Sequence, residues 1–236
     1  MGIKENLEVI NKRIIRAAER SRRNASDITL LAVSKQVESG RIQEAIDSGH
    51  LSFGENYVQE FVSKYDELSE HKNIDWHFIG HLQKNKVKYI IDKVSLIHSV
   101  DKISLAGEIN KRAEKLGIFM PILVEVNLDG EQSKSGIEPD ELGSFLDELS
   151  EFDNIKLSGL MALPPFCENP QDSRKYFKTL RELRDEYKSS YNSLNELSIG
   201  MSHDYEIAVE EGATIVRVGT AIFGERPKKK IHTERT

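Results

Sequence analysis

Short runs of hydrophobic residues alternate with amphipathic segments along almost the whole chain. The runs are rich in β-branched side chains and bounded by polar sequence, which is typical of buried strands. The segments between them repeat hydrophobic positions every three or four residues, which predicts helices with one buried face. The pattern predicts strands at 28–35, 51–54, 76–80, 96–100, 121–127, 157–163, 197–202 and 215–223. It predicts helices at 4–22, 39–48, 57–68, 83–92, 102–116, 139–151, 173–187 and 205–211.

This regular alternation predicts the fold class. Strands that alternate with helices form βαβ units with right-handed crossovers and a parallel sheet. Eight such units in 236 residues match a closed α/β barrel, the (β/α)8 TIM barrel, with the first helix in the place that a last helix would fill. A doubly wound open sheet is the structural alternative. Because no Gly/Ser- or Pro-rich linker divides the chain, we expect one domain over residues 1–226 and a charged tail over 227–236.

Composition and charge narrow the class of protein. Hydrophobic residues make up 38% and charged residues 31% of the chain, as in ordinary globular proteins. The net charge of −6 argues against a nucleic-acid-binding surface. No apolar segment approaches the roughly 20 residues that span a bilayer. The single cysteine, Cys167, excludes an internal disulfide and fits a reducing compartment. We therefore expect a soluble cytoplasmic protein that binds neither nucleic acid nor membranes.

Lys35 is the most informative candidate residue because it ends the first predicted strand. Partial burial at a strand tip disfavours the charged form of an amine, and an uncharged amine can attack an aldehyde. Lys35 could thus hold a carbonyl cofactor or substrate as a Schiff base. The alternative is a lysine that only marks where a strand emerges into solvent, which is the commoner situation.

Two segments near the carboxyl ends of the last two strands suit a phosphate group, which barrels commonly bind there. Ser202 is placed to cap the following helix, whose free N–H groups attract anions. Gly219 permits close approach of the backbone, and Thr220 supplies a hydroxyl. Arg217 lies two residues before Gly219 and so faces the same side of its strand, where a ring nitrogen would satisfy it.

A lysine for an aldehyde, donors for a phosphate and an arginine for a ring nitrogen together describe pyridoxal 5′-phosphate (PLP). Five segments, 31–35, 53–60, 76–86, 197–204 and 216–224, resemble in this order the pyridoxal phosphate homeostasis protein family. The resemblance extends from near Lys4 to Arg226. It implies a PLP barrel of fold type III, similar to the N-terminal domain of alanine racemase but without that enzyme's C-terminal β-rich domain.

The resemblance also implies a set of cofactor-binding residues: Lys35, Asn56, Met201, Ser202, Arg217, Gly219 and Thr220. Lys35 would carry PLP as an internal aldimine, and Arg217 would face the pyridine nitrogen. Asn56 and Met201 would lie beside the ring, and the other three residues would hold the phosphate. A further segment, 126–136, also matches the family but leaves the role of Lys134 open. The resemblance implies neither a catalytic residue nor a metal.

The chemistry of this residue set favours binding over turnover. An arginine against the pyridine nitrogen disfavours its protonation, because two positive charges would face each other, and the ring becomes a weaker electron sink. Racemisation needs an acid and a base on opposite faces of the ring. Lys35 could serve one face, whereas the family lacks the partner-subunit tyrosine that serves the other face in alanine-racemase-like enzymes. His81 and His203 are candidates, but loop histidines are more often solvated or hydrogen-bonded than catalytic.

We therefore predict a PLP-binding protein that acts in vitamin B6 homeostasis and influences the balance of amino acids and keto acids. A PLP-dependent amino-acid racemase is the alternative, and a Schiff-base lyase of aldolase type is a weaker one. The expected partners are PLP and PLP-dependent apoenzymes, and the expected oligomeric state is a monomer.

Overall fold

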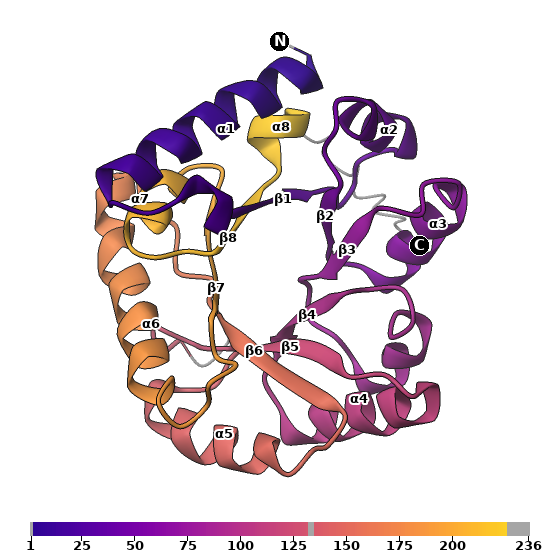
Figure 1. Ribbon diagram of the computed structural model, residues 1–236, viewed down its shortest axis with the longest axis vertical. Helices are drawn as coiled ribbons and strands as arrows, with labels where there is room; N and C mark the ends of the chain where they lie inside the picture. Colours follow the sequence, from indigo (N-terminus) through magenta and orange to yellow (C-terminus); the bar gives the residue numbers. More distant parts are fainter. Residues whose placement is uncertain (1, 132–134, 226–236) are drawn as a thin grey trace, which may run out of the picture.

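The computed structural model describes residues 2–131 and 135–225, and its strands form one closed parallel barrel (Figure 1). The strands are β1 (Thr29–Val33), β2 (Ser52–Glu55), β3 (Asp75–Phe78), β4 (Leu96–Val100), β5 (Met120–Glu125), β6 (Ile155–Met161), β7 (Glu196–Met201) and β8 (Ile215–Val218). They follow one another in sequence order, and β1 pairs with both β2 and β8, which closes the sheet. The predicted (β/α)8 barrel is confirmed.

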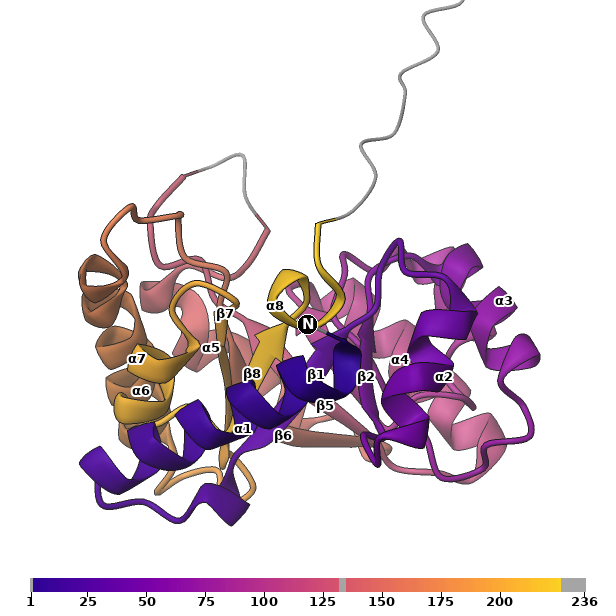
Figure 2. The same ribbon diagram turned by 90° about the horizontal axis from the view of Figure 1, so that it is seen from above.

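Helices cover the outside of the barrel. The α-helices are α1 (Ile3–Arg20), α2 (Ser39–Asp47), α3 (Val58–Glu67), α4 (Ile103–Leu116), α5 (Leu142–Ser150), α6 (Arg174–Tyr187), α7 (Tyr205–Glu210) and α8 (Thr220–Phe223). The 3-10 segments are η1 (Ala25–Asp27), η2 (Lys84–Tyr89), η3 (Pro139–Glu141) and η4 (Pro170–Ser173). Helix α1 packs against α2, α7 and α8, and Figure 2 shows it running beside α7. It therefore takes the place of a last helix, as predicted.

Two predicted elements differ from the structure in type. The strand predicted at 215–223 ends at Val218, because the chain turns at Gly219 and the amides of Ile222 and Phe223 donate to the Gly219 carbonyl. Ile222 and Phe223 are buried, and a short apolar run does not by itself distinguish a buried helix from a strand. The helix predicted at 83–92 is the shorter 3-10 segment η2. The remaining strand ends agree with the predictions within two residues.

The barrel interior is smaller and more polar than the core outside it. The outer core lies between the strands and the helices, whereas the inner cluster consists of Leu31, Val33, Ile79, Leu96, Leu123, Met161 and Ile215. Successive side chains of a strand point to opposite faces, so residues two positions from an inner residue also point inward. This rule places His98, Glu125 and Arg217 inside the barrel, and all three are buried. The interior thus carries ionisable groups beneath the carboxyl ends of the strands.

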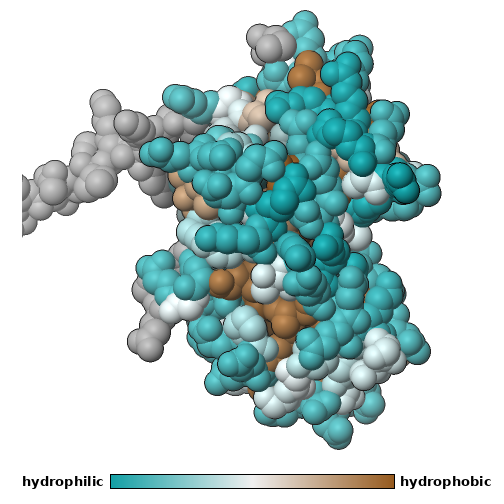
Figure 3. Space-filling view, turned by 90° about the vertical axis from the view of Figure 1, so that its left-hand side faces the viewer, coloured by the Kyte–Doolittle hydropathy of each residue, from teal (hydrophilic) through white to brown (hydrophobic). Residues whose placement is uncertain are grey.

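The outer surface reflects the amphipathic pattern of the helices. Helix α1 buries six residues, Ile3, Leu7, Ile10, Ile14, Ala17 and Ala18. Figure 3 shows the face over α6 and α7 as largely hydrophilic, with smaller hydrophobic areas between the polar side chains. Within residues 2–131 and 135–225, no helix combines the length and the apolar character that crossing a membrane requires.

Candidate functional site

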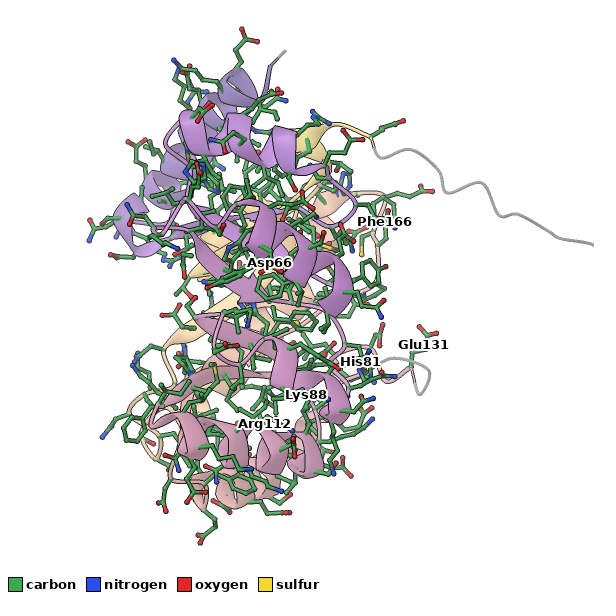
Figure 4. All side chains as sticks on the ribbon, turned by 90° about the vertical axis from the view of Figure 1, so that its right-hand side faces the viewer. Asp66, His81, Lys88, Arg112, Glu131 and Phe166 are labelled. Carbon is green, nitrogen blue, oxygen red and sulfur yellow. The ribbon has the colours of Figure 1, made fainter. Side chains whose placement is uncertain are left out.

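One cavity at the carboxyl ends of the strands brings together every residue of the predicted cofactor set. Its volume is about 300 Å³, and its walls include Lys35, Asn56, Met201, Ser202, Arg217, Gly219 and Thr220. Val33, Ile79, Leu163 and Phe166 supply apolar surface around these polar groups. Figure 4 shows Phe166 and His81 on the same side of the molecule. Residues from both ends of the sequence thus meet in a single space.

A tight turn directly after β1 carries Lys35. The amide of Val37 donates to the Ser34 carbonyl at 3.0 Å and closes the turn. Gln36 has a φ of 58°, which is uncommon for a residue other than glycine and costs conformational energy. The Gln36 amide donates to the Glu60 carboxylate, which helps to hold this conformation. The half-buried Lys35 side chain extends from the turn into the cavity.

A largely buried group of polar and charged residues supports this turn, and we call it the Lys64 network: Ser34, Glu55, Glu60 and Lys64. Lys64 Nζ donates to the Ser34 carbonyl at 2.6 Å, to Glu55 Oε1 at 2.7 Å and to Glu60 Oε1 at 2.6 Å, which uses all three of its hydrogens. Ser34 Oγ donates to Glu55 Oε1 at 2.6 Å. Burial raises the pKa of Glu55, and Lys64 offsets part of that rise. The network thereby fixes the backbone on both sides of Lys35.

Ser202 lies where predicted but does not act as predicted. Its Oγ accepts hydrogen bonds from the amides of Gly219 at 3.2 Å and Ala221 at 3.4 Å. The N-cap residue of α7 is Asp204, whose Oδ1 accepts a bond from the Met201 amide at 2.7 Å. The predicted cap of the following helix by Ser202 is therefore wrong. Instead, the Ser202 hydroxyl sits where two backbone N–H groups after β8 converge.

The sharp turn before Ser202 depends on Gly200. Gly200 has a φ of 87°, and a Cβ there would lie 2.5 Å from the Cβ of Ala208. A residue with a side chain would therefore meet both backbone strain and a clash with α7. Gly200 thus directs Met201 and Ser202 toward the cavity.

Arg217 is buried, and the protein itself satisfies part of its hydrogen-bonding capacity. Nη1 donates to the carbonyl and to Oγ of Ser198, each at 2.6 Å, and Nη2 donates to the Ala162 carbonyl at 2.7 Å. Burial lowers the pKa of Arg217 to about 10, with opposition from Glu125 and Asp204. The guanidinium therefore stays charged at neutral pH and can only donate. The sequence suggested a ring nitrogen as the partner of Arg217. In the structure, a ring nitrogen would be one of several acceptors for this guanidinium, beside Ser198 and the Ala162 carbonyl.

A series of hydrogen bonds continues from Arg217 through the barrel interior, and we call it the histidine chain: Asp75, His77, His98, Ser198 and Arg217. Ser198 Oγ lies 2.9 Å from His98 Nδ1, and His98 Nε2 lies 2.9 Å from His77 Nδ1. His77 Nε2 lies 3.0 Å from Asp75 Oδ2. Burial holds the pKa of His98 well below its usual value, and the positive charge of Arg217 acts in the same direction. His98 is therefore neutral at neutral pH.

Asn56 presents an acceptor that has no partner among residues 2–131 and 135–225. Its Oδ1 is buried without a hydrogen bond, although the residue lines the cavity. The neighbouring Gly80 makes this position possible, because a Cβ at Gly80 would lie 2.1 Å from the Asn56 carbonyl oxygen. A buried oxygen of this kind is costly unless a donor reaches it. The site therefore accommodates a donor that a ligand would bring.

Glu125 was missing from the residues predicted from sequence. It is 5% exposed and lines an adjoining hollow of about 490 Å³, which shares Asn56, Ile79, Leu163, Phe166 and Met201 with the first cavity. Burial, together with the charge of Asp101, raises the pKa of Glu125 to about 7, while Arg217 opposes the rise. The alternation of side chains along β5 could have identified Glu125 from the sequence. Leu123 faces inward, so Glu125, two residues later, faces inward as well.

The two predicted loop histidines have different surroundings. His203 Nε2 bonds to the Glu168 carbonyl at 3.1 Å, and its ring lies 5.1 Å from that of Phe166, so it holds the loop over the cavity. His81 borders the adjoining hollow. Lys134 and the tail 227–236 lie outside the described residues.

Comparison with known proteins gives one consistent answer. The family model "Alanine racemase, N-terminal domain" matches residues 6–227. A pyridoxal phosphate homeostasis protein of Aquifex aeolicus is 50% identical over 227 residues, which is 96% of this chain and 99% of that protein. One of Vibrio cholerae is 40% identical over 231 residues, covering 95% and 97%.

Solved structures agree with these relatives. PipY of Synechococcus elongatus, solved with PLP bound, superposes with a TM-score of 0.83 and is 34% identical in sequence. The superposition covers 94% of this chain and 100% of PipY. An alanine racemase of Clostridium difficile superposes with a TM-score of 0.69 at 16% identity over 97% of this chain and 57% of its own, which shows the shared fold alone. The chain belongs to the pyridoxal phosphate homeostasis protein family, and its barrel is that of the alanine racemase N-terminal domain.

Proposed function

We propose that this protein binds PLP covalently through Lys35 and takes part in intracellular PLP homeostasis as a holder of the cofactor. The observation that carries the proposal is the meeting of all seven predicted residues in one cavity of about 300 Å³. Relatives that are 50% and 40% identical bear the name pyridoxal phosphate homeostasis protein, and the similar PipY was solved with PLP bound.

The chemistry of the cavity fits each part of PLP. Arg217 is a charged donor and suits an unprotonated ring nitrogen. The Ser202 hydroxyl accepts from the amides of Gly219 and Ala221, which leaves its own hydrogen to donate to a phosphate oxygen. The unpartnered Asn56 Oδ1 suits a polar substituent of the ring that donates a hydrogen bond. The ring nitrogen, the phosphate and a polar ring substituent of PLP therefore each have a matching partner in the cavity.

The residues of the chain favour retention of the cofactor. Bound PLP supplies an aldehyde carbon and an electron-withdrawing ring. The Lys64 network holds the turn from which Lys35 approaches the aldehyde. The permanent charge of Arg217 disfavours a proton on the ring nitrogen and so weakens electron withdrawal. Together, these residues attach PLP firmly while they reduce its reactivity toward amino acids.

Borohydride reduction of the protein loaded with PLP, followed by peptide mapping, tests the site. We expect the label on Lys35, and we expect Lys35→Ala to lose the long-wavelength absorbance while it keeps its unfolding transition. Lys84→Ala is the matched control, because Lys84 borders a different hollow, and it should load normally. A label on another lysine, or an absorbance that survives in Lys35→Ala, contradicts the proposal.

Glu125 is the specific observation that supports an amino-acid racemase as the second candidate function. A carboxyl group whose pKa lies near 7 beside the cofactor cavity has the properties of a general acid or base. Incubation with L-alanine in deuterated water separates the two candidates. The homeostasis function predicts no sustained exchange at Cα, whereas sustained exchange that is lost in Glu125→Gln supports the racemase.

We also infer that the protein acts as a cytoplasmic monomer that passes PLP to PLP-dependent apoenzymes. The single cysteine supports a reducing compartment, and the polar face over α6 and α7 supports a monomer. Size-exclusion chromatography with light scattering tests the oligomeric state. Mixing the loaded protein with an apoenzyme, and following the activity that the apoenzyme regains, tests the transfer.

A further inference from the structure

The histidine chain crosses the barrel interior from one end to the other. Asp75 is the first residue of β3, and its side chain is 42% exposed. Arg217 lies near the carboxyl end of β8 and lines the cavity. Three residues connect them, and every link is a hydrogen bond of 3.0 Å or less. A continuous series of bonds therefore joins a solvent-exposed carboxylate to the cavity.

The position of each proton follows from the Asp75 end. Although burial raises the pKa of Asp75, the bonds from His77 and Ser95 outweigh this and lower it. Asp75 is therefore ionised and only accepts, so His77 Nε2 carries a hydrogen. If His77 carries only this hydrogen, its Nδ1 accepts and His98 Nε2 donates to it.

The same order follows independently from the Arg217 end. Arg217 can only donate, and its Nη1 donates to Ser198 Oγ. If His98 Nδ1 also donated to Ser198 Oγ, the hydrogen of this buried hydroxyl would have no acceptor among residues 2–131 and 135–225, so His98 Nδ1 accepts it. A neutral His98 with an accepting Nδ1 carries its hydrogen on Nε2. Both ends thus require the same tautomer of His98.

We propose that His77, His98 and Ser198 are positioning residues for Arg217, and that their bonds form a proton-ordered relay between the Asp75–His77 pair and the cavity. The fixed negative charge at one end and the fixed positive charge at the other select a single direction for all hydrogen bonds between them. The part of the proposal that concerns the cofactor rests on the proposed function, whereas the order of the protons does not.

A second proton on His77 would reverse the order. His77 Nδ1 would then donate to His98 Nε2, and a neutral His98 would move its hydrogen to Nδ1, facing Ser198. The Ser198 hydroxyl would then lose His98 Nδ1 as its acceptor. Its oxygen would face two donors, the Arg217 guanidinium and the N–H group of His98 Nδ1. The charges around the relay are those of Asp75 beside His77, and of Glu125 and Asp204 beside Arg217. Protonation of His77 would thereby change the hydrogen bonding of the Ser198 hydroxyl that Arg217 contacts.

Nitrogen NMR of the protein with isotope-labelled histidine, recorded without cofactor, tests the proton order. We expect His98 to be neutral at neutral pH with its hydrogen on Nε2, and we expect a hydrogen on Nε2 of His77. In Ser198→Ala, His98 Nδ1 loses its donor, so its nitrogen signal should shift while the protein remains folded. A hydrogen on Nδ1 of His98 in the wild-type protein, or a charged His98, overturns the proposal whether or not PLP binds.

The pH dependence of absorbance in protein loaded with PLP tests the link to the cavity. Asp75→Asn should shift the midpoint of that titration by about half a pH unit or more, since it removes the charge that orders the relay. Asp92→Asn is the matched control, because Asp92 is exposed and pairs with its neighbour Lys93, and it should leave the midpoint unchanged. Equal midpoints in Asp75→Asn and the wild-type protein overturn the link. A protein that takes up no PLP at Lys35 contradicts the proposed function and leaves the NMR result standing.

Discussion

The Lys64 network and the histidine chain approach the same cavity from opposite sides of the barrel wall. Ser34 and Glu55 lie on the outward face of their strands, where Lys64 of α3 reaches them, whereas His98 and Ser198 lie inside the barrel. The Lys64 network joins one ammonium to two carboxylates. The histidine chain instead separates its charges and places neutral groups between them. Loss of one member should therefore have different consequences in the two regions.

Buried charge makes the Lys64 network the more fragile of the two. Removal of one partner from a buried ion pair leaves an uncompensated charge, which costs about 3 to 5 kcal/mol. Loss of one hydrogen bond between neutral buried groups costs about 1 to 3 kcal/mol. The turn of Lys35 thus depends on charge compensation, while the orientation of Arg217 depends on the geometry of hydrogen bonds.

Lys64→Met should have the largest effect on stability. It leaves Glu55 and Glu60 without their cation and frees the Ser34 carbonyl, so we expect the free energy of unfolding to fall by about 3 to 5 kcal/mol. Uptake of PLP at Lys35 should weaken in parallel. Urea denaturation measures the first effect, and absorbance during titration with PLP measures the second.

Lys178→Met is the control for this comparison. Lys178 forms an exposed pair with Glu182 at 3.6 Å, and its loss should cost less than about 1 kcal/mol. Similar losses in the two variants would mean that burial of the Lys64 network contributes nothing to stability.

Glu125→Gln should have the next largest effect and should depend on pH. The pKa of Glu125 is about 7 in the folded protein against an ordinary 4.5, so the folded state binds this proton more tightly. Its contribution to stability is fully present below about pH 4.5 and is lost as pH rises through about 7, a change of about 3 to 4 kcal/mol at most. The variant should remove this slope, which urea denaturation at several pH values measures. Glu182→Gln, an exposed control, should leave the slope unchanged.

Ser198→Ala should have the smallest effect of the three. Arg217 keeps its bonds to the carbonyls of Ser198 and Ala162, and His98 loses one partner, so we expect a loss of about 1 to 3 kcal/mol. Ser173→Ala is the matched control, because Ser173 Oγ is equally buried but has no hydrogen bond among residues 2–131 and 135–225. That change should be nearly neutral. If Ser198→Ala were as neutral as its control, the hydroxyl would not hold Arg217.

The predictable features were those that repeat along the chain or lie close together in it. Alternation of apolar runs with amphipathic segments predicted the barrel. The barrel in turn placed Lys35, Arg217 and Gly219 together at the carboxyl ends of the strands. The errors arose where a local pattern had two structural meanings. The apolar residues after Gly219 suited either a strand or a helix, and the structure makes them α8. A serine before α7 suggested a helix cap, yet its hydroxyl meets the amides after β8.

The sequence by itself thus determined the fold class and the side chains that end each strand, because the periods of strands and helices are local properties of the chain. Only the tertiary structure decided the partners of those side chains. His98 meets Ser198 and Arg217 meets the Ala162 carbonyl because closure of the barrel brings separate elements into contact. The pKa of Glu125 depends on burial and on Asp101, which lies on the preceding strand-to-helix connection. Such contacts join residues that are distant in sequence, so their energies arise only when the sheet closes.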